Sequence, residues 1–246
     1  MKVYFPKEID VSNITYKELT ALGESQAKVA YMNLNDQMIY VQTPLMSCPY
    51  GLSSFEGDGG RMKYSLDLSF GGDSDSVKVL KEFLEKIDEK VLDDSTKNSL
   101  TWFKKKSQSR DVSSALFTPS IKVATEDGEP TDKYPPTFKV KIPFYDDKFK
   151  VQCYNDSREL ITDPFETLVG KGQRVRAILK LAGNWFAGGK FGMKWDLHSL
   201  KLTPKTRIEA YAFEDSDDEE EDGNSENNTP VATDGNDYVL SSEDEL

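Results

Sequence analysis

A short segment in the last third of the chain combines flat rings with cations. Residues 184–195 read NWFAGGKFGMKW, which places together Trp185, Phe186, Lys190, Phe191 and Lys194. Cations neutralise phosphates and release counterions, while exposed rings stack under bases at about 1–3 kcal/mol per base. This chemistry predicts a surface that holds a single nucleic-acid strand.

The same rings have an alternative role in packing. Trp195 and Phe191 lie in phase with an apolar strand face, which favours burial in the core. Trp185 and Phe186 fall at the tip of an expected hairpin, where a buried ring is less expected, so packing and binding both stay open for them.

Further cations alternate with apolar residues on neighbouring expected strands. They are Lys139, Lys141, Lys148, Lys150, Arg174, Arg176 and Lys180. Lysines on outer strand faces also serve solubility and prevent edge pairing. Their concentration on adjacent strands favours a track for a phosphate backbone instead.

The sequence contains few residues that could support catalysis or hold a metal. It has no GxxxxGK[ST] phosphate loop, no HExxH motif and no paired cysteine ligands, and His198 is its single histidine. Cys48 and Cys153 stand far apart and are expected to be buried small hydrophobic residues. We therefore expect no enzyme activity, no cofactor and no metal site.

The charge is distributed very unevenly along the chain. Residues 214–246 hold fourteen Asp or Glu and no Lys or Arg, which leaves 29 acidic against 31 basic residues in positions 1–213. This composition predicts a folded domain at 1–213 and a disordered acidic tail at 214–246. A tethered polyanion beside a basic surface would compete with nucleic acid, and the apolar Tyr238, Val239 and Leu240 within it suggest a recognition motif for a partner.

The first half of the body reads as strands followed by a helix. Strands are expected at 28–34 and 38–43, a long loop at 44–60, and a half-buried strand at 61–70. Apolar residues then recur at helical spacing, at Val77, Leu80, Leu84, Ile87 and Val91. A short helix around Trp102 follows, and 107–118 and 125–136 are expected to be loops.

The second half of the body returns to strands. Residues 138–142 and 148–153 are expected to form a hairpin with four lysines outside. Residues 172–182 and 191–203 predict two longer strands, the second with a bulge near His198, because Leu200 and Leu202 fall on the opposite parity to Leu197.

This order predicts a mainly β fold with one amphipathic helix. It suits a five-stranded oligonucleotide-binding barrel with extra strands, an architecture whose helix lies between the third and fourth strands. Periodicity alone allows a β-sandwich equally well. No run of eighteen apolar residues and no signal peptide is seen, so an intracellular location is expected.

Two segments resemble a known family. Residues 134–151 (YPPTFKVKIPFYDDKFKV) and 170–202 (ending GNWFAGGKFGMKWDLHSLKL) look like the single-stranded DNA-binding proteins of nucleocytoplasmic large DNA viruses, such as algal and giant viruses. The resemblance implies an oligonucleotide-binding barrel that coats single strands in replication, repair or recombination without base specificity. It also implies that the acidic tail recruits replication proteins and that the protein works at viral replication sites in the host cytoplasm or nucleus. A homo-oligomer is compatible with this role.

The residues leave two other classes of protein open. One is an acidic-tailed histone or protein chaperone on a β-sandwich, which the cationic strand faces disfavour because they would repel histones. The other is a virion structural protein that happens to be rich in strands.

Overall fold

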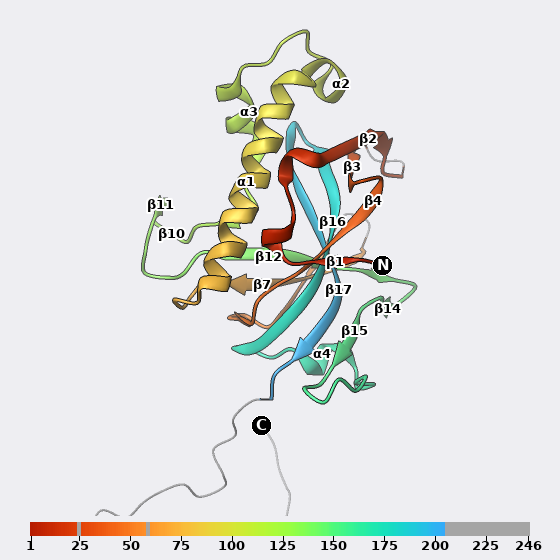
Figure 1. The fold of residues 1–246 in the computed structure, drawn as a ribbon, viewed down its shortest axis with the longest axis vertical. Coiled ribbons are helices and arrows are strands. Elements are labelled where there is room, and N and C mark those ends of the chain that lie inside the picture. Colours follow the sequence, from red (N-terminus) through yellow and green to blue (C-terminus); the bar gives the residue numbers. More distant parts are fainter. Residues whose placement is uncertain (24–25, 58–59, 205–246) are drawn as a thin grey trace, which may run out of the picture. The chain divides into compact units, whose positions relative to one another are not determined.

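The computed structural model describes residues 1–23, 26–57 and 60–204 (Figure 1). The acidic segment 214–246 and its Tyr238–Leu240 motif lie outside the described residues.

Five strands close into a barrel. They are β5 (Met46–Cys48), β7 (Met62–Ser69), β12 (Thr137–Ile142), β16 (Gln173–Ala187) and β17 (Lys190–Leu202). The pairing runs β5–β7–β12–β17–β16 and returns from β16 to β5, with β12 and β17 parallel and the other neighbours antiparallel. This ring has the order 1-2-3-5-4-1 of the oligonucleotide-binding barrel, which confirms the barrel prediction over the sandwich.

Extra strands extend the barrel on both sides, as predicted. On one side the meander of β2 (Ile14–Ala21), β3 (Lys28–Leu34) and β4 (Gln37–Gln42) pairs with β16, and β1 (Val3–Tyr4) pairs with β4. Elsewhere β6 (Leu52–Glu56) pairs with β7, β8 (Phe117–Thr118) and β15 (Gln152–Tyr154) pair with β17, and β9 (Ile121–Lys122) pairs with β12. Two 3₁₀ turns, η1 (Pro6–Glu8) and η2 (Val11–Asn13), precede β2.

The predicted amphipathic helix is α1 (Asp75–Lys97), and its apolar residues at helical spacing are buried as expected. It lies alongside the β16–β17 ribbon (Figure 1), where Phe83 meets Trp195 edge-on at 6.4 Å between ring centroids. The short helix around Trp102 is also present, as α2 (Ser99–Phe103). None of the described helices is both long and apolar enough to cross a membrane.

The helix is inserted at a different place from the one the architecture led us to expect. α1 follows the second barrel strand, β7, and precedes the third, β12. Between the third and fourth strands only α4 (Phe165–Leu168), a single turn, is found. In this position α1 still buries its apolar stripe in the core, where Phe83 meets Trp195 of β17.

The expected loops contain more structure than their composition indicated. Segment 44–60 holds β5 and β6, and 107–118 holds α3 (Arg110–Leu116), whose N-cap Ser109 accepts a hydrogen bond from the Val112 amide. Segment 125–136 holds the hairpin of β10 (Thr125–Glu126) and β11 (Glu129–Pro130). Strands as short as β5 are too short to show an alternating pattern, and pairing with neighbours forms them.

The predicted hairpin of 138–142 with 148–153 is wrong. β12 pairs with β7, β9 and β17, and the chain after it forms a separate small hairpin of β13 (Phe144–Tyr145) and β14 (Lys148–Phe149). Asp146 and Asp147, both at positive φ, make the turn of this small hairpin. Both segments alternate correctly, but alternation does not identify the partner strand.

The β16–β17 ribbon agrees with the sequence prediction in detail. Leu179 faces Leu197 and Ile178 faces Ser199, so His198 is the extra residue of the expected bulge. A second register shift follows Leu181 and brings Gly183 against β3. A Cβ at Gly183 would lie 2.3 Å from the Ala30 carbonyl oxygen, so this crossing of strands requires glycine.

Candidate nucleic-acid interface

The outer face of the barrel carries a row of charges across three strands. Lys180 on β16 is opposite Asp196 on β17, which in turn is opposite Lys141 on β12. Desolvation by the surrounding protein lowers the pKa of Lys141, and repulsion from Lys194 and Lys63 adds to this, while Asp196 opposes it. Asp196 binds Lys194 at 3.1 Å, so its carboxylate lies among Lys141, Lys180 and Lys194. The cluster can accept further negative charge.

The cations continue along the ribbon toward the start of β16 and the end of β17. Arg176 on β16 is opposite Lys201 on β17, and both line a pocket of about 500 Å³ together with Arg158 and His198. Burial lowers the pKa of His198, and so does the charge of Lys180. The pocket therefore lies next to the row formed by Lys180, Asp196 and Lys141. We call this surface the outer cationic face and define it by Lys63, Lys141, Lys180, Lys194, Arg158, Arg176 and Lys201.

Of the four rings first singled out in the sequence, Trp185 alone faces outward. It is half-buried and lies against Gly192, since a Cβ on that glycine would come within 3.3 Å of its ring. The absence of a side chain at Gly192 gives the ring its place on the face that also carries Lys194.

Phe186 and Phe191 are core residues. They stack on each other at 6.0 Å between centroids and contact Trp102 or Phe103 of α2. With both ring faces taken up by protein, neither can stack under a base in this conformation, so they are removed from the candidate site. Trp195 is likewise buried, against Phe83 and Phe138.

The remaining predicted cations are distributed over several surfaces. Lys148 and Lys150 lie on the β13–β14 hairpin, where Lys150 is 3.8 Å from Asp146. Lys190 lies at the tip of the ribbon, beside a pocket that also includes Lys28 and Lys105. Arg174 neighbours Arg176 around a pocket next to the start of α1, and Lys139 pairs with Asp67 at 3.8 Å. The four lysines expected on one hairpin face are thus divided, because that hairpin does not form.

Several exposed rings near the second and third barrel strands were not singled out in the sequence. Tyr50, Phe55, Tyr134 and Tyr145 are each 54–58% exposed. Lys63 lies over Phe55 at 5.5 Å, and Lys133 lies over Tyr134 at 5.7 Å. Large aromatic residues within polar, Gly- and Pro-rich stretches were the signal that could have identified them.

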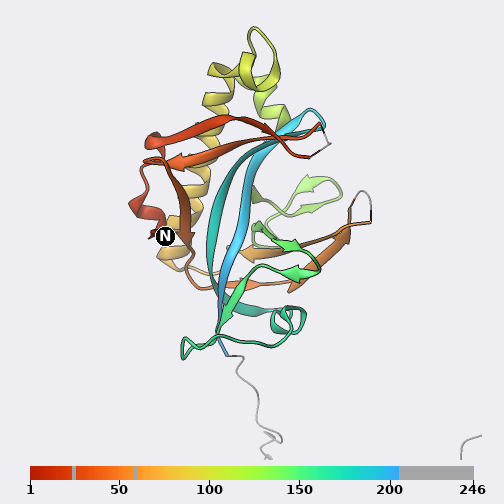
Figure 2. The ribbon, with the colours of Figure 1, turned by 90° about the vertical axis from the view of Figure 1, so that its right-hand side faces the viewer.

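These rings belong to segments that project on one side of the barrel. In Figure 2 the β6–β7 end, the β10–β11 hairpin and the β13–β14 hairpin all lie on the same side of the β16–β17 ribbon. Oligonucleotide-binding barrels use the face of their second and third strands, which here are β7 and β12, together with the adjoining loops.

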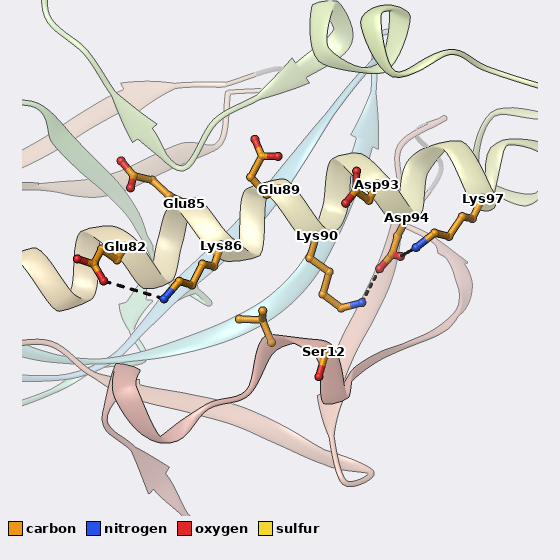
Figure 3. Close-up of a pocket in the computed structure, with 10 residues that line it drawn as sticks. Ser12, Glu82, Glu85, Lys86, Glu89, Lys90, Asp93, Asp94 and Lys97 are labelled. Carbon is orange, nitrogen blue, oxygen red and sulfur yellow. Dashed lines mark hydrogen bonds and ion pairs between the residues drawn. The ribbon is translucent and has the colours of Figure 1, made fainter.

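The surface beside α1 carries charges of both signs that pair with one another. A hollow of about 640 Å³ lies between α1 and η2 (Figure 3). Glu82, Glu85, Glu89 and Asp93 follow one another along the helix, and Lys86, Lys90 and Lys97 are held in ion pairs with Glu82 or Asp94. Glu85 pairs with Lys81, and Glu89 and Asp93 pair with Arg110, so the charges of this face are largely satisfied within the protein, and we do not place this face in the interface.

No catalytic or metal constellation stands out in the part of the chain that the structure describes. Within it, no group of three His, Cys, Asp or Glu side chains is placed to hold a metal ion. Cys48 and Cys153 are buried free thiols, as predicted, and burial raises the pKa of Cys48 to about 12 and that of Cys153 to about 11. Such thiols are poor nucleophiles at neutral pH.

The fold and this surface define a class: a five-stranded barrel of the oligonucleotide-binding type with a cationic outer face. Residues 74–215 match a family of unknown function (DUF5871), and the chain belongs to this family. No curated protein matches the sequence.

The chain is similar to two solved phage structures. One is gp2.5, a single-stranded DNA-binding protein encoded by bacteriophage T7, with 13% identity, a TM-score of 0.44, and coverage of 72% of this chain and 92% of that chain. The other is the single-stranded DNA-binding protein from bacteriophage Enc34 in complex with ssDNA, with 14% identity, a TM-score of 0.44, and coverage of 79% and 99%.

Proposed function

We propose that this protein binds single-stranded DNA stoichiometrically, without catalysis and without a cofactor. The observation that carries the proposal is the outer cationic face, where Lys141, Lys180 and Lys194 lie around the Asp196 carboxylate and the charge of Lys63 also acts on Lys141. Phosphates would replace the counterions of this face, and Trp185 with the exposed rings near β7 and β12 would stack under bases.

We further propose that residues 214–246 regulate this binding. Their fourteen carboxylates and absence of cations suit them to occupy the cationic face when DNA is absent, and DNA would release them. Once released, the segment would recruit replication proteins through its apolar motif. In this proposal the chain is the single-strand coating protein of a large DNA virus, as the sequence resemblance suggests, and it acts at viral replication sites in the host cell.

The first experiment is a titration of fluorescein-labelled oligo(dT) with the full-length protein, followed by anisotropy over a salt series. We expect binding whose affinity falls on a log–log plot with a slope of about −0.7 per phosphate neutralised. Replacing Lys141 and Lys194 together by Gln should weaken binding and make this slope shallower. No binding at low salt would refute the proposal. It would favour a chaperone of basic protein clients or a virion structural protein.

A matched control removes the same charge from another surface. Lys78→Gln with Lys81→Gln leaves the outer cationic face and the exposed rings intact, because both residues lie at exposed positions on α1. We expect this variant to keep most of the affinity. Equal losses in the two double variants would mean that total charge, and not this face, determines binding.

A further inference from the structure

An acidic residue is enclosed on the same side of the barrel as the exposed rings. Asp67 lies on β7 between Leu66 and Leu68, whose side chains are in the core. By the alternation of a strand Asp67 points to the outer face, where exposure is expected. Yet its side chain is only 8% exposed. Its burial therefore comes from what covers the outer face at this point.

The cover forms a pocket of about 410 Å³. Asp67 lines it together with Tyr50, Tyr134, Lys122 and Lys139. Ligand pockets commonly measure about 300–1,000 Å³, so a nucleotide fits this volume. Both tyrosines are more than half exposed, so their rings remain available to a ligand, and the two lysines supply positive charge.

The Asp67 carboxylate has unused capacity to accept hydrogen bonds. Across the described part of the chain, its single ion pair is to Lys139 at 3.8 Å, beyond hydrogen-bonding distance, and no group donates a hydrogen bond to it. An ionised carboxylate has about four acceptor positions, which solvent or a ligand can fill where the protein supplies no donor. The pocket thus holds a polar group that a suitable ligand would satisfy.

We propose that this pocket is a guanine-selective base site within the single-strand interface. Guanine presents N1–H and N2–H side by side, which match the two oxygens of a carboxylate, and bidentate charge-assisted pairs are the strong ones. Thymine offers one N–H between two carbonyl oxygens that a carboxylate repels, and cytosine and adenine offer one amino group beside an acceptor nitrogen. The tyrosines would contact the ring and the lysines the neighbouring phosphates.

This inference rests on the proposed function and refines it. A strand held mainly by its phosphates would bind with little regard to sequence, apart from one position where the base enters this pocket. The family resemblance implies binding without base specificity, whereas the fold brings Asp67 beside the exposed rings.

The test compares labelled oligomers on the full-length protein. One is all thymidine, one carries guanines at intervals, and one carries hypoxanthine at the same positions, which lacks the N2 amino group. We expect the guanine oligomer to bind about tenfold more tightly than the thymidine oligomer, with the hypoxanthine oligomer between them. Asp67→Asn should bring the guanine and thymidine affinities together, because an amide cannot accept both guanine N–H groups as the carboxylate does.

A second variant covers the risk that the buried substitution disturbs the fold. Tyr134→Ala removes an exposed ring from the pocket and should also reduce the guanine preference, whereas Phe5→Ala, an exposed ring outside the pocket, should keep it. Equal binding of guanine and thymidine oligomers by the unmodified protein would overturn the inference and leave the proposed function standing. If no oligomer binds, the proposed function fails and this inference fails with it.

Discussion

At the scale of single residues, the most unusual acid in the core is Asp88 on α1. Its carboxylate accepts hydrogen bonds from the Ser120 amide and hydroxyl, both at 2.7 Å, which fixes the segment before β9 onto the helix. Burial nevertheless raises its pKa from 3.8 to about 6, because desolvation of the charged form outweighs those two bonds. The folded state therefore holds this proton more tightly than the unfolded chain does.

This pKa predicts how stability depends on pH. With the folded pKa above the unfolded one, the contribution of Asp88 is complete below pH 4 and is lost as pH rises through about 6, by about 2–3 kcal/mol in all. Asp88→Asn has no such titration. The free energy of unfolding is measured by denaturant for both proteins. The value for the native protein minus that for Asp88→Asn should decline between pH 4 and pH 7.

The matched control is Asp75→Asn, on the same helix, where the side chain is 99% exposed. The difference in the free energy of unfolding between the native protein and Asp75→Asn should stay nearly constant over that pH range, because both proteins keep Asp88. A difference between native protein and Asp88→Asn that stays constant with pH would contradict the assigned role of Asp88.

At the scale of elements, the β16–β17 ribbon depends on one glycine. Gly183 has φ +149°, and a Cβ there would collide with the backbone of Ala30 and Tyr31 on β3. Gly183→Ala should lower the free energy of unfolding by about 3 kcal/mol. Gly188→Ala, at φ +57° with open space around it, carries only the conformational cost of about 1–2 kcal/mol. Thermal or chemical unfolding of both variants checks this, and equal losses would show that the strand crossing is not the cause.

The elements also show how far a sequence can be read. Long periodic segments, such as α1 and the β16–β17 ribbon with its bulge at His198, were predictable because burial repeats along many residues. β5 was missed because three residues cannot display a period, although it closes the barrel. The 138–153 hairpin failed because alternation reports a buried face and not the partner strand.

The candidate site was likewise predictable where it depends on the alternation of a strand, and not where it depends on which strands pair. Lys141, Lys180 and Lys194 were predictable as outward cations, since their neighbours face the core. Lys63 and Asp67 were predictable as residues of the polar face of the 61–70 strand but not as members of the site, because only the register of β7 against β12 brings them beside these cations and rings. Phe191 is buried, as its phase in the strand favoured, and the packing role that the sequence left open for Phe186 is the observed one, because α2 covers both rings from a distant part of the sequence.

At the scale of the whole molecule, the charge division between residues 1–213 and 214–246 leads to the last prediction. If the acidic segment competes with DNA, the protein ending at residue 213 should bind oligo(dT) more tightly than the full chain at low salt. The difference should shrink as salt rises, because the Debye length falls from about 30 Å at 0.01 M to about 8 Å at 0.15 M and screens the attraction. Anisotropy titrations over a salt series measure both effects.

A control separates charge from chain length. A full-length variant in which Asn and Gln replace the fourteen carboxylates of 214–246 keeps the length but not the charge. It should behave like the shortened protein if competition is electrostatic, and like the native protein if the segment acts by excluded volume. Weaker DNA binding by the shortened protein would rule out competition and indicate that the segment assists binding instead, for example by promoting contacts between adjacent copies along the strand.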